Sequence, residues 1–134
     1  MAVEWRADRS QVEEAFANDV MALLEADPGD WVVTCGARDR ATEAAGYAAW
    51  LADPEHAPKF TDPDNSAHCT QPKALAVDVT LRTGETDDWN YQDEAWQRMT
   101  RAVLASEHLH SLGPSIGDWD HIERYNWREF VGTP

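Results

Sequence analysis

Apolar residues change their spacing several times along the chain, and these changes limit the fold more than any other feature. Val12, Phe16 and Val20 recur at helical spacing, whereas residues 31–35 form a short run of β-type residues. Similar segments of both kinds follow, each ended by a group of Gly, Pro, Asp or Asn. The expected elements are helices over 12–24, 41–51 and 92–106, and strands over 31–35, 74–81 and 119–125.

This order of elements predicts an α+β fold, with a small antiparallel sheet packed with about three helices. A chain of 134 residues is the right length for one domain, and no linker or repeat interrupts it. We therefore expect a single domain over residues 1–134.

Local signals refine the helices. Ser10 and Glu13 have the spacing of a capping box, which predicts that Ser10 caps the first helix. Asp27-Pro28-Gly29-Asp30 should end it. The second helix is expected to face the core with the residues that recur at helical spacing, namely Ala44, Tyr47, Ala48 and Leu51.

Residues 53–73 read as one long loop, because four prolines fall among several Asp and Asn residues. Loops of this length are uncommon in compact domains and are often functional. This segment is therefore expected to contribute to a site.

The charge of the chain excludes several classes of function. A formal net charge of −14 argues against nucleic acid as a partner, since phosphate binding requires basic side chains. No apolar run approaches the roughly 20 residues that span a membrane, so no membrane insertion is expected. The first residues lack the basic and apolar regions of a signal peptide, which predicts synthesis in the cytoplasm.

Two histidines stand near carboxylates beside expected strands. His68 precedes the strand that carries Asp78, and His121 follows Asp118 by three residues. A catalytic zinc site needs three protein ligands and one open position, and two imidazoles with one carboxylate meet this need. The residue types alone leave another reading open, in which His68 is a surface residue of the loop and His121 pairs with a nearby carboxylate, Asp120 or Glu123.

These segments together resemble a known family. Ser66-x-His68, then Asp78, then Asp118-x-x-His121 is similar to the M15 family of zinc peptidases. That family includes D-Ala-D-Ala dipeptidases and carboxypeptidases and phage L-alanyl-D-glutamate endolysins. The segment 34–38 also resembles the family's strand-to-helix motif, so the resemblance covers about residues 30–125.

The resemblance implies a role for each matching residue. His68, Asp78 and His121 would hold one Zn²⁺ per chain. Asp118 would be the catalytic acid and base, and Arg38 would steady the substrate or its developing oxyanion. Ser66 and Trp119 would support or line the substrate groove. Lys73 matches no motif residue, but as one of the few nearby cations it is a candidate to bind a substrate carboxylate.

The sequence also departs from the family pattern. His68 and Asp78 are ten residues apart, three more than is usual, and the insertion falls within residues 69–73. An insertion in a loop need not move the ligands at its two ends, but it can reshape the groove. Cys35 and Cys69 each adjoin a site motif, which leaves open a pair of free thiols or a redox-sensitive bridge.

We therefore expect a zinc metallopeptidase that cuts a bond in bacterial peptidoglycan stem peptides. The favoured bond is L-alanyl-D-glutamate, as in phage or prophage endolysins. A D,D-carboxypeptidase or dipeptidase is an alternative, as is a zinc-stabilised binding module without activity. A monomer is expected, reaching the cell wall after release or delivery.

Overall fold

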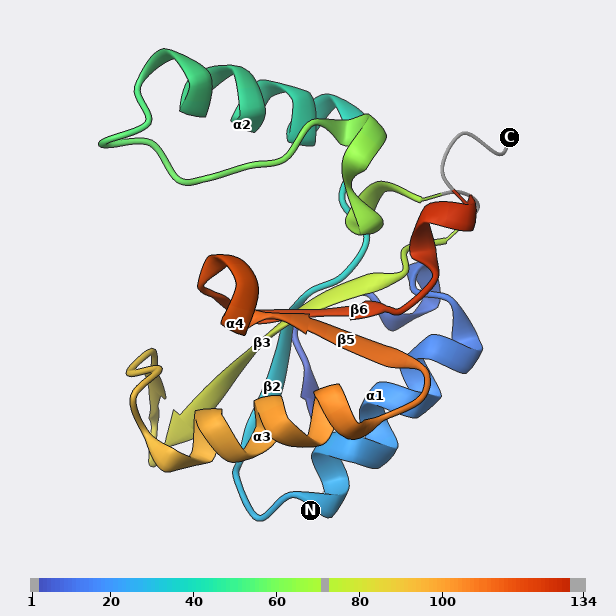
Figure 1. The fold of residues 1–134 in the computed structure, drawn as a ribbon, viewed down its shortest axis with the longest axis vertical. Helices are drawn as coiled ribbons and strands as arrows, with labels where there is room; N and C mark the ends of the chain where they lie inside the picture. The colour runs from blue at the N-terminus through green and yellow to red at the C-terminus, as the bar shows by residue number, and fades with distance from the viewer. Residues whose placement is uncertain (1–2, 71–72, 131–134) are drawn as a thin grey trace.

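A mixed sheet forms the centre of the computed structural model, which describes residues 3–70 and 73–130 (Figure 1). Within these ranges the strand order is β1-β2-β3-β6-β5, and β4 pairs with the far end of β3. β1 runs parallel to β2, and the other neighbouring pairs are antiparallel. The strands are β1 Glu4–Trp5, β2 Trp31–Cys35, β3 Ala76–Thr83, β4 Thr86–Asp88, β5 Leu109–Leu112 and β6 Asp118–Arg124.

Three longer helices and one short helix accompany the sheet in the described residues, and the predicted α+β class is confirmed. None of these helices is long and apolar enough to cross a membrane. Part of the predicted insertion, Gln71 and Pro72, lies outside the described residues. The helices are α1 Glu14–Ala26, α2 Arg40–Ala52, α3 Glu94–Ala105 and α4 Gly113–Ile116, with 3₁₀ turns η1 Arg9–Gln11, η2 Pro63–Asn65, η3 Ala67–Cys69 and η4 Trp127–Phe130.

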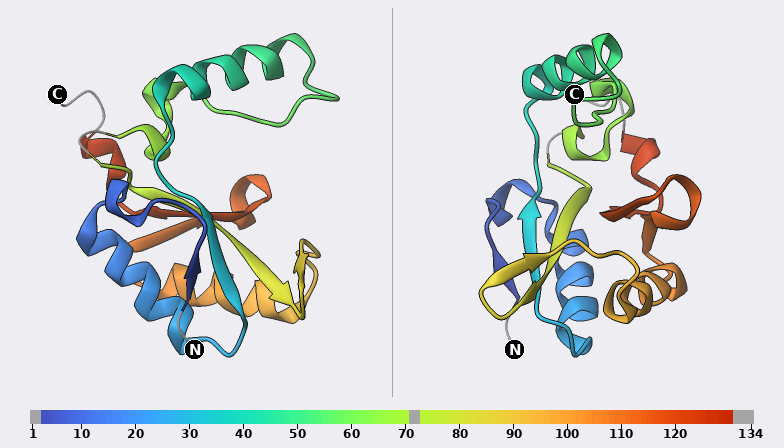
Figure 2. Two further views of the ribbon diagram at one scale, coloured as in Figure 1. Left: turned by 180° about the vertical axis from the view of Figure 1, so that it is seen from behind. Right: turned by 90° about the vertical axis from the view of Figure 1, so that its left-hand side faces the viewer.

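The hydrophobic core lies where α1 and α3 pack against one face of the sheet (Figures 1 and 2). Each helix contributes residues at helical spacing, and Trp96 of α3 is fully buried. Its ring meets Trp31 of β2 edge-on, with the ring centroids 5.0 Å apart. The helical core residues are Phe16, Ala17, Val20, Leu24, Trp96, Met99 and Val103.

The start of α1 differs from the prediction. Glu13, rather than Ser10, caps the helix, because its carboxylate accepts from the backbone N–H groups of Ala15 and Phe16. Ser10 instead donates to Asp8 within η1. The chain bends into this turn before α1 begins, so Ser10 lies too early to cap it. The predicted stop after the helix is confirmed, since α1 ends at Ala26.

Helix α2 and the loop after it extend away from the sheet as an arm, which we define as residues 40–65 (Figures 1 and 2). The helix was predicted correctly, but its inward face was wrong. Glu43 is its only buried residue among those described, and Leu51 is 58% exposed. Alanine has the highest helix propensity, so α2 can form without an apolar stripe against the sheet. The remaining residues predicted to face inward are exposed (Ala44 and Ala48) or half-buried (Tyr47).

Candidate metal centre

Asp78 lies in the middle of the sheet and marks the centre of the site. In the strand register it is directly opposite His121 of β6 and also opposite Cys35 of β2. Val33 pairs with Val79, and an irregularity after Val33 shifts the pairing by one residue. A shift of one residue turns a side chain to the other face of a sheet, and this brings Cys35 to the face of Asp78.

His68 reaches the same place from the η3 turn. The backbone N–H of Arg38 donates to the carbonyl of His68 at 2.9 Å, which ties η3 to the segment after β2. Nδ1 of His68 lies 2.7 Å from the carbonyl oxygen of Gly36. A carbonyl can only accept, so Nδ1 carries the hydrogen and, in the neutral ring, Nε2 keeps its lone pair.

His121 is held in the complementary tautomer. Its Nε2 lies 2.7 Å from Oε1 of Glu123, and Nε1 of Trp127 donates to Oε2 of the same carboxylate at 2.6 Å. Glu123 is buried, and these two donors satisfy both of its oxygens. The hydrogen on His121 therefore sits on Nε2, which leaves the lone pair of Nδ1 directed at the site.

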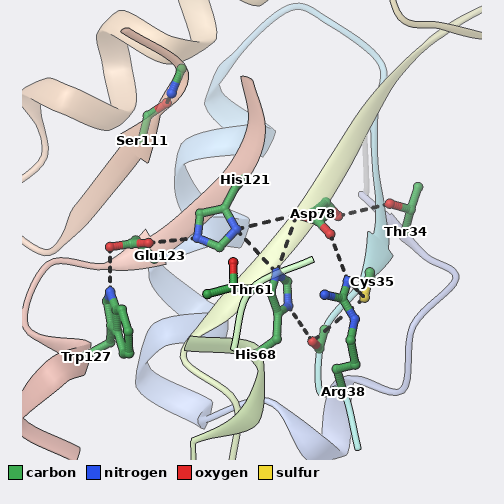
Figure 3. Close-up of polar contacts among 12 residues, drawn as sticks. Thr34, Cys35, Arg38, Thr61, His68, Asp78, Ser111, His121, Glu123 and Trp127 are labelled. Carbon is green, nitrogen blue, oxygen red and sulfur yellow. Dashed lines mark hydrogen bonds and ion pairs between the residues drawn. The ribbon is translucent and has the colours of Figure 1, made fainter. Parts of the chain in front are cut away.

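Three donor atoms converge in this arrangement (Figure 3). Nε2 of His68 is 3.3 Å from Nδ1 of His121, and Oδ1 of Asp78 lies 3.5 Å from the first and 3.6 Å from the second. Tetrahedral zinc with bonds of about 2.0–2.2 Å separates its ligand atoms by about 3.3–3.6 Å. The donor set and its spacing therefore fit a zinc ion.

The charges of the three side chains depend on one another. Burial and the two histidines act in opposite directions on Asp78, and the histidines prevail, so the pKa of Asp78 lies well below its usual range. Burial opposes protonation of His68, but Asp78 outweighs it and raises the pKa of His68 to about 10. For His121, burial is outweighed by Asp78 and Glu123, and the pKa rises to about 9. A metal ion at this place would displace protons.

Arg38 lies beside Asp78, one of the three predicted ligands. One terminal nitrogen forms an ion pair with Glu43 at 2.7 Å. The other lies 3.5 Å from Oδ2 of Asp78 and 3.3 Å from Sγ of Cys35. Burial is outweighed by the partnership with Glu43, and the pKa of Arg38 is raised further above its usual value. Glu43 was not predicted, because an acidic residue in an alanine-rich helix usually faces solvent.

Cys35 gives a second possible set of metal donors. Its sulfur, with one donor atom each of His68 and Asp78, forms a group whose atoms lie within 4.8 Å of one another. The set that includes His121 fits zinc better, because its atoms are 3.3–3.6 Å apart and Glu123 orients the imidazole. Cys35 and Cys69 are both free thiols.

Asp118 begins β6 and is half-buried. It interacts with Asp120, two residues along. Burial, a hydrogen bond with Asp118 and the nearby charge of Asp78 raise the pKa of Asp120 to about 7. Two carboxyl groups therefore share a place near the predicted ligands, whereas the sequence assigned the acid–base role to Asp118 alone and considered Asp120 only as a partner of His121.

The residues predicted to bind substrate are spread more widely. Ser66 is 5% exposed and precedes η3, where its side chain makes no capping hydrogen bond. Trp119 is half-buried and packs so closely on Gly113 that an added Cβ there would lie 2.3 Å from its ring. Lys73 is exposed. The pKa of Asp8 is lowered mainly by hydrogen bonds from Ser10, and the charge of Lys73 adds to this effect.

Comparisons with known proteins bear on the fold. No family model and no curated protein sequence matches the chain. The L-Ala D-Glu endopeptidase ChiX of Serratia marcescens is similar in structure, with a TM-score of 0.66 and 16% identity over 91% of this chain and 86% of ChiX. The vancomycin resistance D,D-dipeptidase VanXYg, solved with a D-Ala-D-Ala phosphinate analogue, has a TM-score of 0.56 and 17% identity over 84% of this chain and 50% of VanXYg.

The chain has the fold of these two peptidases. The resemblance to M15 zinc peptidases that the sequence indicated is thus confirmed in the fold. At 16–17% identity the comparison does not extend to the substrate.

Proposed function

We propose that this protein is a zinc-dependent peptidase that cuts a peptide bond in bacterial peptidoglycan stem peptides. The observation that carries the proposal is the convergence of His68, Asp78 and His121, whose donor atoms lie 3.3–3.6 Å apart. The fold shared with an L-Ala D-Glu endopeptidase and a D,D-dipeptidase supports the choice of reaction and substrate class.

In this proposal the three converging side chains hold Zn²⁺. The ion would supply a Lewis acid that polarises the scissile carbonyl and lowers the pKa of water. The carbonyl of Gly36 and the carboxylate of Glu123 fix the tautomers of the two histidines, so each presents a lone pair at the site.

Proton transfer is assigned to the carboxyl pair of Asp118 and Asp120. Asp118 would take a proton from the attacking water and return it to the leaving amine. Asp118 is hydrogen-bonded to Asp120, whose pKa is raised to about 7. The two carboxyl groups can therefore share one proton near neutral pH. Glu123 is unsuited to this task, because His121 and Trp127 occupy its two oxygens.

For the bond that is cut, we propose L-alanyl-D-glutamate. An enzyme that removes a terminal D-Ala needs a cation for the free carboxylate. Arg38 is paired with Glu43 and lies against Asp78, and the charge of Lys73 acts near Asp8. Arg124 lies 3.7 Å from Glu13. Arg38 and Arg124, two of the three cations nearest the motifs in the sequence, thus already have carboxylate partners, which favours an endopeptidase.

A D,D-carboxypeptidase or dipeptidase is the second candidate, and its support is the likeness to VanXYg. In that case Lys73, which lies in the inserted loop before Asp78, would be the carboxylate anchor.

Product analysis distinguishes these candidates. Whole peptidoglycan and a muramyl pentapeptide are incubated with the zinc-loaded protein, with His121→Ala as the inactive control, and products are identified by mass spectrometry. We expect a new amino terminus on D-Glu. Release of D-Ala alone, abolished by Lys73→Ala, would instead establish the second candidate. No cleavage of either substrate by protein that holds zinc would contradict the proposed function.

The proton-transfer assignment has its own test. Asp118→Ala should keep zinc and the fold but lose about 10²–10⁴-fold in turnover, the usual contribution of a general acid–base group. Asp120→Ala should lose less and shift the pH profile. Near-parental turnover in Asp118→Ala together with an inactive Asp120→Ala would move the role to Asp120.

A further inference from the structure

Glu43 is a buried charge that the reaction as described does not use. Its side chain is 1% exposed, and it is the only buried residue of α2 among those described. Burying a carboxylate is costly unless a cation and hydrogen-bond donors compensate it. A charge at this one position therefore calls for a specific partner.

Both oxygens of Glu43 are engaged, and by different parts of the site. Oε2 accepts from Arg38 at 2.7 Å, and Oε1 accepts from the backbone N–H of Thr61 at 3.3 Å. Phe60, beside Thr61, places its ring 5.1 Å from the guanidinium carbon of Arg38. The same ring packs on Gly46, where an added Cβ would lie 2.4 Å from it. One carboxylate thus joins Arg38, α2 and the loop of the arm.

Arg38 carries this connection on to the metal ligands. Its second terminal nitrogen lies 3.5 Å from Oδ2 of Asp78, while Oδ1 is the oxygen that faces His68 and His121. A cation on Oδ2 leaves Oδ1 as the single oxygen directed at the metal position. Glu43 sets the position of the guanidinium. The position of the guanidinium in turn sets which oxygen Asp78 presents to the metal position.

We infer that Glu43 is a positioning residue, which holds Arg38 against Asp78 and joins the arm to the metal centre. The effect of Glu43 on turnover rests on the proposed peptidase function. Glu43 touches neither the metal position nor the reacting atoms, and it acts through Arg38.

Glu43→Gln tests this with little change in shape. The glutamine oxygen can accept from one partner only, and its NH₂ group would face a donor at the other. We expect kcat to fall by about 10²-fold, as for a misplaced catalytic geometry, with KM changed less and one zinc still bound. Glu55→Gln makes the same charge change at an exposed position of the arm and should match the parent.

Combining variants shows whether Glu43 acts through Arg38. Arg38→Ala leaves the buried carboxylate without its cation, so its melting temperature should fall strongly. The double variant Arg38→Ala/Glu43→Gln should recover part of that melting temperature without regaining turnover. Its kcat should equal that of Arg38→Ala, because the second change removes nothing further. Glu43→Asp, which keeps the charge on a shorter side chain, should fall between Gln and the parent.

Two outcomes would overturn the inference: parental kcat in Glu43→Gln, or multiplicative losses of kcat in the double variant. If Glu43→Gln does not fold, the double variant and Glu43→Asp carry the same comparison. An inactive parent that binds zinc would count against the proposed function alone. The melting temperatures would still decide whether Arg38 and Glu43 act as one unit.

Discussion

Glu123→Gln is the sharpest single test of how the protein prepares a metal ligand. Glu123 accepts from Nε2 of His121 at 2.7 Å and from Nε1 of Trp127 at 2.6 Å, and its side chain is 4% exposed. Glutamine has nearly the same shape, but it carries no charge and offers one acceptor where two donors converge. Either His121 or Trp127 must then face an N–H group.

The expected loss follows from the role of that carboxylate. Removing a partner that orients a metal-bound histidine typically lowers metal affinity about 10–100-fold, which corresponds to about 1.4–2.7 kcal/mol. We expect Glu123→Gln to weaken zinc binding by that factor. Trp127→Phe should weaken it less, since the bond from His121 to Glu123 remains.

Competition with a fluorescent zinc chelator measures both affinities, and circular dichroism checks that the variants are folded. Glu129→Gln, at an exposed position of η4, is the matched control and should bind zinc like the parent. A folded Glu123→Gln protein with parental zinc affinity would refute the account of how His121 is oriented.

Three further results are expected. Burial would raise the pKa of Asp27, but hydrogen bonds, first of all from Arg98, outweigh it and lower the pKa to about 2. The contribution of Asp27 to the free energy of unfolding is therefore present above about pH 4 and lost as the pH falls toward 2. Asp27→Asn should therefore cost at most about 2 kcal/mol in urea unfolding at pH 7 and nothing near pH 2; an equal cost at both would contradict this. Because the pKa values of His68 and His121 are about 10 and 9 without metal, zinc binding at pH 7 should release protons and weaken as the pH falls. Calorimetry in two buffers of different ionisation enthalpy checks this, and buffer-independent heats would count against it. Gly46→Ala should destabilise the arm by about 1–3 kcal/mol, because its Cβ would meet a ring at 2.4 Å; unchanged stability would show that the contact is loose.

The elements were predictable where the local pattern was strong. The strand before residue 36 and the long helices follow from spacing and from their stop signals. β5, Leu109–Leu112, was not predicted, because its four residues are a strand only through pairing with β6. The inward face predicted for α2 was wrong for a related reason. A run of alanines forms a helix without indicating what it packs against.

The site was predictable in part. Residue types and order, with the family resemblance, named His68, Asp78 and His121. The register of β3 and β6 brings Asp78 and His121 together, and the η3 turn places His68 beside them. Their partners were harder to find. The sequence left open whether Asp120 or Glu123 supports His121, and alternation along β6 decides for Glu123. Glu43 could not be found, since its burial depends on the loop near residue 61 folding back.

The central claim is that three side chains hold one zinc ion. Crystals of the zinc-loaded protein, with anomalous diffraction recorded at the zinc absorption edge, test it most directly. We expect one strong peak per chain, about 2.0–2.2 Å from Nε2 of His68, Nδ1 of His121 and Oδ1 of Asp78. A peak bound by Cys35 in place of His121, or the absence of any peak among these residues, would contradict the account.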